Sequence, residues 1–247
     1  MSVSVFVSSF AGVDVGAKIA AAYASLPAQG GEIIVDLAGS IATGVLFGVS
    51  GKTAILTGFG NALILKYTGT GPAITFNNGP AFDFCSRFEA LTLTGPGNTS
   101  STVGLQIGGT NGAIGLTTRN FLIQGFGVGV KTQSNTFLTQ DRNSGSNYAR
   151  LLFLQGGVVQ MVGIGMFTPA GVPLSNAAFL ANAVNVSLLG FNDLSGAADL
   201  LGGNTLSIRS ACIGWNRRVK SRSKCQWQSD SVGWDWKCGH SDLGPAY

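Results

Sequence analysis

The sequence predicts an all-β solenoid that begins with a single helix. Two observations carry this prediction: a helical pattern of apolar residues occurs only near the start, and short β-branched runs that end on glycine recur after it. The composition agrees, since 11% of the 247 residues are charged and 37 are glycine, as expected of stacked strands joined by tight turns. Because glycine, asparagine, threonine or serine interrupts every apolar segment, no membrane span is expected.

The predicted helix lies near the start of the chain and is expected to cap the solenoid. Its apolar positions, spaced i, i+4, i+7, i+8 and i+11, are Val15, Ile19, Ala22, Tyr23 and Leu26. Asp14 is the expected N-cap, and Pro27 with the following glycines ends the helix. Such a helix would cover the apolar end of the first coil and its unpaired strand edges.

After residue 31 the pattern changes to short apolar runs that recur along the chain. Five of these runs close on Gly58, Gly95, Gly125, Gly156 and Gly190, which are 37, 30, 31 and 34 residues apart. A second series, 73–79, 103–109 and 127–135, lies between the earlier ones. The gaps hold no helical pattern, which argues against βαβ units. An all-β sandwich is the alternative, but it would place turns about every 8–12 residues, so we favour the solenoid.

The last part of the chain differs from the rest. We divide the sequence into a strand and capping helix (1–31), a solenoid (32–208) and an atypical tail (209–247). The first two parts together carry eight basic and eight acidic residues, whereas the tail carries seven basic and three acidic ones, all four tryptophans and three of the four cysteines. The surplus charge of +4 therefore describes the tail and does not indicate a nucleic-acid-binding protein.

Four interpretations of the tail compete. A zinc site fits poorly, because Cys212, Cys225 and Cys238 are each 13 residues apart and form no close pair. A basic patch with neighbouring tryptophans could bind single-stranded nucleic acid. We favour the remaining two: a disordered or loosely packed extension, or out-of-frame translation, in which case the natural protein continues with further coils after about Ser210. We accordingly expect no metal and no nucleic-acid partner.

Two motifs are rejected as cofactor sites. The segment GVSGKT (48–53) ends like a phosphate-binding loop, but Leu46 stands where the first glycine is required and a strand follows where a helix must begin. Lys52 is therefore predicted to be a solvated turn residue. GFGVGV (125–130) lacks the glycine spacing and the helix of a dinucleotide site. No cofactor is expected.

Two polar groupings are the candidate sites. In DFCSRFE (83–89), odd-numbered residues would share one face of an extended segment, which gathers Asp83, Arg87 and Glu89. The segment 140–150 is the longest polar run before the tail; it contains Asp141, Arg142, Asn143, Asn147, Tyr148 and Arg150. Segments that project from a rigid scaffold often carry binding groups, although a surface turn with local ion pairs explains both groupings as well.

Three segments carry a resemblance to a known family. FVSSFAGVDVGAKIAAAYASLPAQGGEIIVDLAG (6–39) and LTGFGNALILKYTGTGPAITFNNG (56–79) resemble the first coils of right-handed parallel β-helix proteins of the pectate-lyase-like superfamily. There a capping helix leads into a GG-x-I strand, as around Gly31 here. NFLIQGFGVGVKTQSNTFLTQDRNS (120–144) is similar to the middle coils of that group, so the resemblance covers about residues 6–208.

The resemblance implies a right-handed parallel β-helix with a short N-terminal capping helix, and a protein that binds or cleaves polysaccharide. It implies secretion or a bacterial cell-surface location, although no signal peptide is visible. For a polysaccharide lyase or glycoside hydrolase, the catalytic candidates are Asp141, Arg142 and Arg150. The substrate-binding candidates are Asn143, Asn147, Tyr148, Asp83, Arg87 and Glu89.

The family's catalytic aspartate motifs are absent from this sequence. The alternative is a noncatalytic structural module, such as a surface adhesin or a phage tailspike segment. Acidic and basic groups converging on one face of the solenoid would favour the enzyme.

Overall fold

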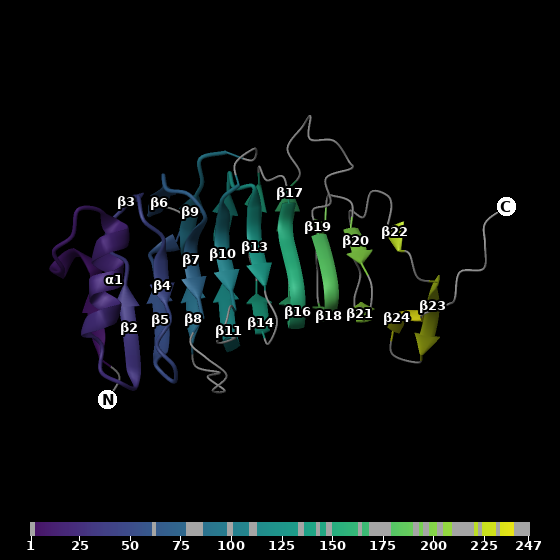
Figure 1. Ribbon diagram of the computed structural model, residues 1–247. Coiled ribbons are helices and arrows are strands. Elements are labelled where there is room, and N and C mark those ends of the chain that lie inside the picture. The colour runs from purple at the N-terminus through teal and green to yellow at the C-terminus, as the bar shows by residue number, and fades with distance from the viewer. Residues whose placement is uncertain are drawn as a thin grey trace.

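The computed structural model describes residues 3–60, 63–77, 86–97, 101–108 and 113–132, and beyond these the backbone of the strands named below. Within that part of the chain the protein is mostly β-strand, with one 3-10 turn, η1 (Val7–Ser9), and one α-helix, α1 (Val15–Ser25). The strands follow one another along an elongated stack, with α1 at one end (Figure 1).

One large sheet consists of two branches that meet in a long strand, β16 (Arg150–Val162). The first branch contains β1 (Ser4–Phe6), β2 (Gly30–Ile34), β5 (Thr53–Thr57), β8 (Arg87–Glu89), β11 (Ala113–Arg119) and β14 (Thr136–Asp141). The second branch contains β4 (Val45–Phe47), β7 (Pro72–Phe76), β10 (Val103–Ile107) and β13 (Val128–Thr132). Past β16 the same sheet continues with β18 (Phe179–Leu189), β20 (Ala198–Leu201), β21 (Thr205–Ile208) and β22 (Lys220–Ser221).

The second sheet is built from the strands that lie between the two branches in sequence. It contains β3 (Gly39–Ile41), β6 (Ile64–Tyr67), β9 (Thr92–Thr94), β12 (Leu122–Gln124), β15 (Ser144–Ser146), β17 (Gly165–Phe167) and β19 (Asp193–Leu194). In the tail, β23 (Lys224–Asp230) and β24 (Gly233–Gly239) form a separate antiparallel pair.

Every described pairing in the two larger sheets is parallel, and from β2 to β15 a strand pairs with the strand three places further along the chain. Three consecutive strands thus make one pass, and the next pass stacks directly on it. The arrangement confirms a mostly parallel all-β protein with one helix, and it is consistent with an all-β parallel solenoid.

The interior is a stack of apolar side chains in register from pass to pass. Ile33, Leu56 and Phe88 are register partners on β2, β5 and β8, and all three are fully buried. Phe88 also contacts Phe47 and Phe76 of the second branch, with ring centroids 5.0 and 5.6 Å apart. Aromatic pairs at such distances add about 0.5–1.5 kcal/mol beyond their buried area, so this cluster links the branches across the core.

The N-terminal cap is fixed by one carboxylate. Asp14 is the N-cap of α1, as predicted: its Oδ1 accepts a hydrogen bond from the backbone N–H of Ala17 at 2.7 Å. Its Oδ2 accepts another from the N–H of Ala42, between β3 and β4, at 2.6 Å. Gly16 lies so close to Ile41 that a Cβ there would meet its Cγ2 at 2.8 Å. The helix therefore packs directly on the first pass.

Lys52 is buried, and the prediction that it is a solvated turn residue is wrong. Its Nζ donates hydrogen bonds to the carbonyls of Tyr23 at 2.7 Å and Leu26 at 2.8 Å, and it lies 4.7 Å from the centre of the Tyr23 ring. Helix C-termini present unpaired carbonyls and partial negative charge, which attract a cation. Removal from water lowers the pKa of the ammonium group.

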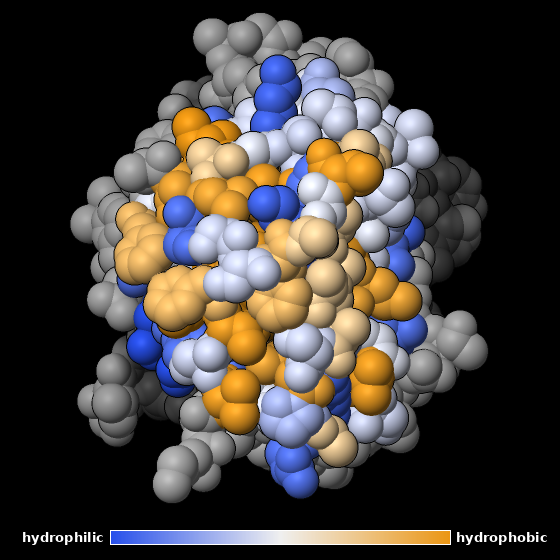
Figure 2. Space-filling model, turned by 90° about the vertical axis from the view of Figure 1, so that its left-hand side faces the viewer, coloured by the Kyte–Doolittle hydropathy of each residue, from blue (hydrophilic) through white to orange (hydrophobic). Residues whose placement is uncertain are grey.

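The surface at the α1 end mixes apolar and polar side chains, as Figure 2 shows. Val3, Phe6 and Val13 are 42%, 48% and 99% exposed. Among the residues that the structure describes, no helix is long and apolar enough to cross a membrane.

Candidate functional site

Polar and charged side chains line the outer surface of the first branch. On β8 the side chain of Phe88 is buried, while Arg87 and Glu89 on either side of it remain 49% and 22% exposed. Residues 87 and 89 therefore share the outer face, as the alternation of an extended strand predicts. Arg87 Nε lies 3.5 Å from Glu89 Oε1, which makes an ion pair along the strand.

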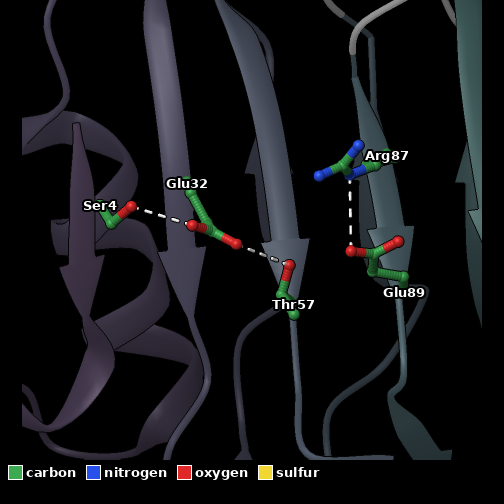
Figure 3. A network of polar contacts seen from close by, with 5 residues as sticks. All are labelled: Ser4, Glu32, Thr57, Arg87 and Glu89. Atoms are coloured by element: carbon green, nitrogen blue, oxygen red, sulfur yellow. Dashed lines mark hydrogen bonds and ion pairs between the residues drawn. The ribbon is translucent and has the colours of Figure 1, made fainter. Parts of the chain in front are cut away.

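Glu32 links three neighbouring strands of this face (Figure 3). Its Oε2 accepts a hydrogen bond from the hydroxyl of Ser4 on β1 at 2.9 Å, and its Oε1 accepts one from Thr57 on β5 at 3.2 Å. Two hydroxyl donors on neighbouring strands thus position the carboxylate. The alternation of the strand indicates that Glu32 faces outward, because its neighbours Gly31 and Ile33 are buried and residues of a strand alternate between its two faces.

Polar and charged residues also lie in a row across the sheet, at the ends of the first-branch strands. Thr57, Glu89 and Arg119 are register partners on β5, β8 and β11, and Arg119 is exposed. Asp141 at the end of β14 is the register partner of Arg119. Adjacent strands in a sheet lie about 4.7–4.9 Å apart, so these positions succeed one another at that interval. We name the positions Thr57, Glu89, Arg119 and Asp141 the charged row.

The charged row joins the two groupings that the sequence predicted separately. Glu89 comes from the 83–89 segment and Asp141 from the 140–150 segment, and one strand, β11, lies between them in the sheet. Arg119 supplies the cation between these two acidic positions, and sequence reasoning did not select it. The structure thus brings parts of both groupings to the same branch.

Arg150 lies elsewhere in the fold. It begins β16 and is the register partner of Val128 on β13, in the second branch. Of the remaining candidates, Arg142, Asn143, Asn147, Tyr148 and Asp83 lie outside the described residues. Their proposed roles, and those of Asp141 and Arg150, stay predictions.

The polar groups of this face are held in place from beneath. Ser86, which precedes Arg87, is fully buried, and its hydroxyl oxygen accepts a hydrogen bond from the N–H of Ala54 at 2.9 Å. Phe88 anchors the same strand in the core. Arg87 and Glu89 therefore project from a backbone that is fixed on both sides, which keeps the cost of ordering them on ligand binding low.

The chemistry available on this face consists of guanidinium donors, carboxylate acceptors and hydroxyls. Glu32 already accepts hydroxyl hydrogen bonds, and an arginine presents several N–H donors in a planar fork. No group of three or more His, Cys, Asp or Glu side chains suited to a metal ion occurs within the described part of the chain. Comparison with protein-family models, with curated proteins and with solved structures found no match to this chain.

Proposed function

We propose that this protein is a right-handed parallel β-helix that binds a polysaccharide on the outer face of its first branch. The parallel stacking supports the proposed handedness, because about 98% of crossovers between parallel strands of one sheet are right-handed. The resemblance of residues 6–39, 56–79 and 120–144 to pectate-lyase-like proteins supports both the fold and the ligand class. The location that the resemblance implies is the cell surface or the extracellular space.

The charged row is the observation that carries the proposal. A polysaccharide presents hydroxyl groups at regular intervals, and each hydroxyl both donates and accepts hydrogen bonds. Thr57, Glu89 and Arg119 offer an acceptor or a donor on three successive strands, about 4.7–4.9 Å apart, an interval close to the length of one sugar unit, and Asp141 occupies the next register position. Successive sugar units of an extended chain can therefore meet successive strands.

Cleavage of the polysaccharide is a second candidate function. One observation favours it: acidic and basic residues share one face, since Glu32, Arg87, Glu89 and Arg119 line the first branch and Asp141 continues the charged row. Either a hydrolase or a lyase needs a carboxylate or a basic group that moves a proton at the scissile bond. Asp141, Arg142 and Arg150 remain the proposed catalytic groups.

The test is to present the purified full-length protein with a panel of neutral and acidic polysaccharides. Retention in affinity electrophoresis measures binding, while new reducing ends and the ultraviolet absorbance of unsaturated products measure hydrolysis and elimination. We expect retention by at least one polysaccharide. Neither retention nor product with any of them would contradict the proposal and favour a noncatalytic structural module.

A further inference from the structure

Phe59 is an exposed aromatic residue at the edge of the first branch. It follows β5 by two residues, and 64% of its surface is accessible to solvent. Burying a phenylalanine side chain is favourable, yet single exposed apolar residues are common. The exposure of Phe59 alone therefore does not indicate a role, and its surroundings decide the question.

The backbone on both sides of Phe59 is fixed. Gly58 donates a hydrogen bond to the carbonyl of Glu89 at 3.0 Å, and Gly60 donates one to the carbonyl of Ala90 at 2.9 Å. Gly60 has a φ of +79°, which side chains rarely allow, and a Cβ at Gly58 would lie 2.5 Å from the carbonyl oxygen of Ala90. Both glycines are needed for this turn, so the ring of Phe59 is carried by a rigid support.

Phe59 stands beside the charged row. Thr57, two residues earlier, is a member of that row, and Gly58 between them is buried. The hydrogen bond from Gly58 ends on Glu89, whose carboxylate pairs with Arg87 on the outer face. The aromatic ring of Phe59 therefore follows directly on β5, and the hydrogen-bonding groups are carried by β5 and its neighbour β8.

We propose that Phe59 is a stacking platform for a sugar ring of the bound polysaccharide. The inference rests on the proposed function and deepens it. Pyranose rings with mostly equatorial hydroxyls present an apolar C–H face and a polar rim. In this proposal Phe59 takes the apolar face, while Thr57, Glu89 and Arg87, on β5 and the neighbouring β8, supply partners for the rim's hydroxyls. An aromatic side chain offers this contact area at low cost in conformational entropy.

The ligand class follows from the same contacts. A sugar whose axial hydroxyls cover both faces of the ring cannot stack on Phe59, so the site favours units with one open C–H face. A protein partner would need a wider apolar surface, because interface anchors lie in a surrounding ring of contacts. Phe59 is flanked by two glycines, and its neighbours across the strand pair are charged.

The test compares Phe59→Ala, Phe59→Trp and a control, Ile64→Ala. Ile64 is also an exposed apolar residue, 45% accessible, but it lies on β6 of the second sheet. Affinities are measured by affinity electrophoresis and calorimetry with the polysaccharide that retains the unaltered protein. We expect Phe59→Ala to weaken binding roughly 3- to 10-fold, while Phe59→Trp and Ile64→Ala bind as the unaltered protein does.

The outcomes separate the two proposals. If the unaltered protein binds a polysaccharide and Phe59→Ala binds equally well, the stacking role is overturned and the proposed function stands. Equal losses in Phe59→Ala and Ile64→Ala also overturn it, because they indicate a nonspecific apolar effect. If the unaltered protein binds no polysaccharide, the proposed function fails and the inference falls with it. Because Phe59 is exposed, its substitution should leave the unfolding transition unchanged, which circular dichroism verifies.

Discussion

Lys52 of the second pass donates hydrogen bonds to the carbonyl oxygens of Tyr23 and Leu26, the last residues of the capping helix and its C-cap. The contact connects residues 26 and 29 positions apart in the sequence. The ammonium group of Lys52 lies at the C-terminal end of the helix, where burial excludes water. Lys52 therefore holds the C-terminal end of the cap to the solenoid, as Asp14 holds its N-terminal end.

Replacing Lys52 by methionine should destabilise the protein. Methionine fills a similar volume but removes the Lys52 donor from the carbonyl of Leu26 and one of the two donors from the carbonyl of Tyr23, which keeps the N–H of Leu26. An unpaired buried polar group costs about 1–3 kcal/mol. Denaturant unfolding followed by circular dichroism measures the change. The control is Lys66→Met, on the exposed side of β6, which should unfold as the unaltered protein does. Equal stability of both variants would contradict the role of Lys52.

Asp14 should be a sensitive position of the cap. Its carboxylate serves both the helix and the first pass, so Asp14→Ala removes two hydrogen bonds at once. Loss of an N-cap alone costs about 0.5–2 kcal/mol, and the bond to Ala42 adds to it. Asp14→Asn retains an acceptor and should lose less. A thermal unfolding curve for each variant checks the order, and a smaller loss in the alanine variant would contradict it.

Asp36 should make the stability of the cap depend on acid pH. Partial burial acts to raise its pKa, but hydrogen bonds from the hydroxyl and the backbone N–H of Ser8 outweigh burial, so its pKa lies below its ordinary value of 3.8. A carboxyl group whose folded-state pKa is depressed stabilises the fold fully above its unfolded pKa. That contribution is lost as the pH falls through the lower, folded-state pKa.

The free energy of unfolding, measured in denaturant from pH 6 down to about pH 2, tests this expectation. The unaltered protein should lose more stability on acidification than Asp36→Asn, which carries no titrating group at this position. Parallel curves for the two proteins would show that the bond between Ser8 and Asp36 adds nothing to the pH dependence.

Phe88 should be the most costly core residue of the middle passes. It is fully buried and contacts aromatic rings of the second branch, so Phe88→Ala is expected to cost about 3–5 kcal/mol. Phe88→Leu leaves a smaller cavity and should cost less. Unfolding in urea measures both; a tolerated alanine would mean that the branches are not joined through this cluster.

Arg119 should contribute to binding because it stands between two acidic positions of the charged row. Arg119→Ala is expected to weaken polysaccharide binding roughly tenfold, the usual effect of removing a hydrogen bond to or from a charged group. Lys66→Ala removes the same charge from the outer face of the second sheet and is the matched control. An equal loss of affinity in both variants would mean that binding depends on the net positive charge and not on the position of Arg119.

The sequence predicts the helix and the strand runs well, because both follow from local periodicity. The second series of runs (73–79, 103–109 and 127–135) corresponds to β7, β10 and β13, which are direct neighbours in one branch. The first series is mixed. Gly58 follows β5 of the first branch, Gly95 and Gly125 follow strands of the second sheet, and Gly156 lies inside β16. Glycine follows strands at different corners of a pass, so its spacing gives the repeat length without the register.

Because the sequence shows local periodicity but not the register between passes, it could reveal only some of the candidate site residues. Arg87 and Glu89 share a face through the local alternation of β8, and their role in binding stays a prediction. Thr57 and Arg119 meet Glu89 only through pairing between passes. The segments between strands differ in length from one pass to the next, so that pairing has no fixed sequence interval. The prediction of a solvated Lys52 is wrong because the packing of α1 against this residue, which the local sequence does not reveal, keeps water away from it.

The way the chain crosses from the second branch to the first changes along the molecule. In the sequence, residues 48–52, 77–86, 108–112 and 133–135 separate strands of the second branch from the next strands of the first, whereas the single strand β16 pairs with both branches. The longest of these intervals leads directly into the strand that holds Arg87 and Glu89. We expect changes of length there to leave the hydrogen-bond ladders of β8 intact and to alter what the proposed binding face accepts, independently of what keeps the protein folded.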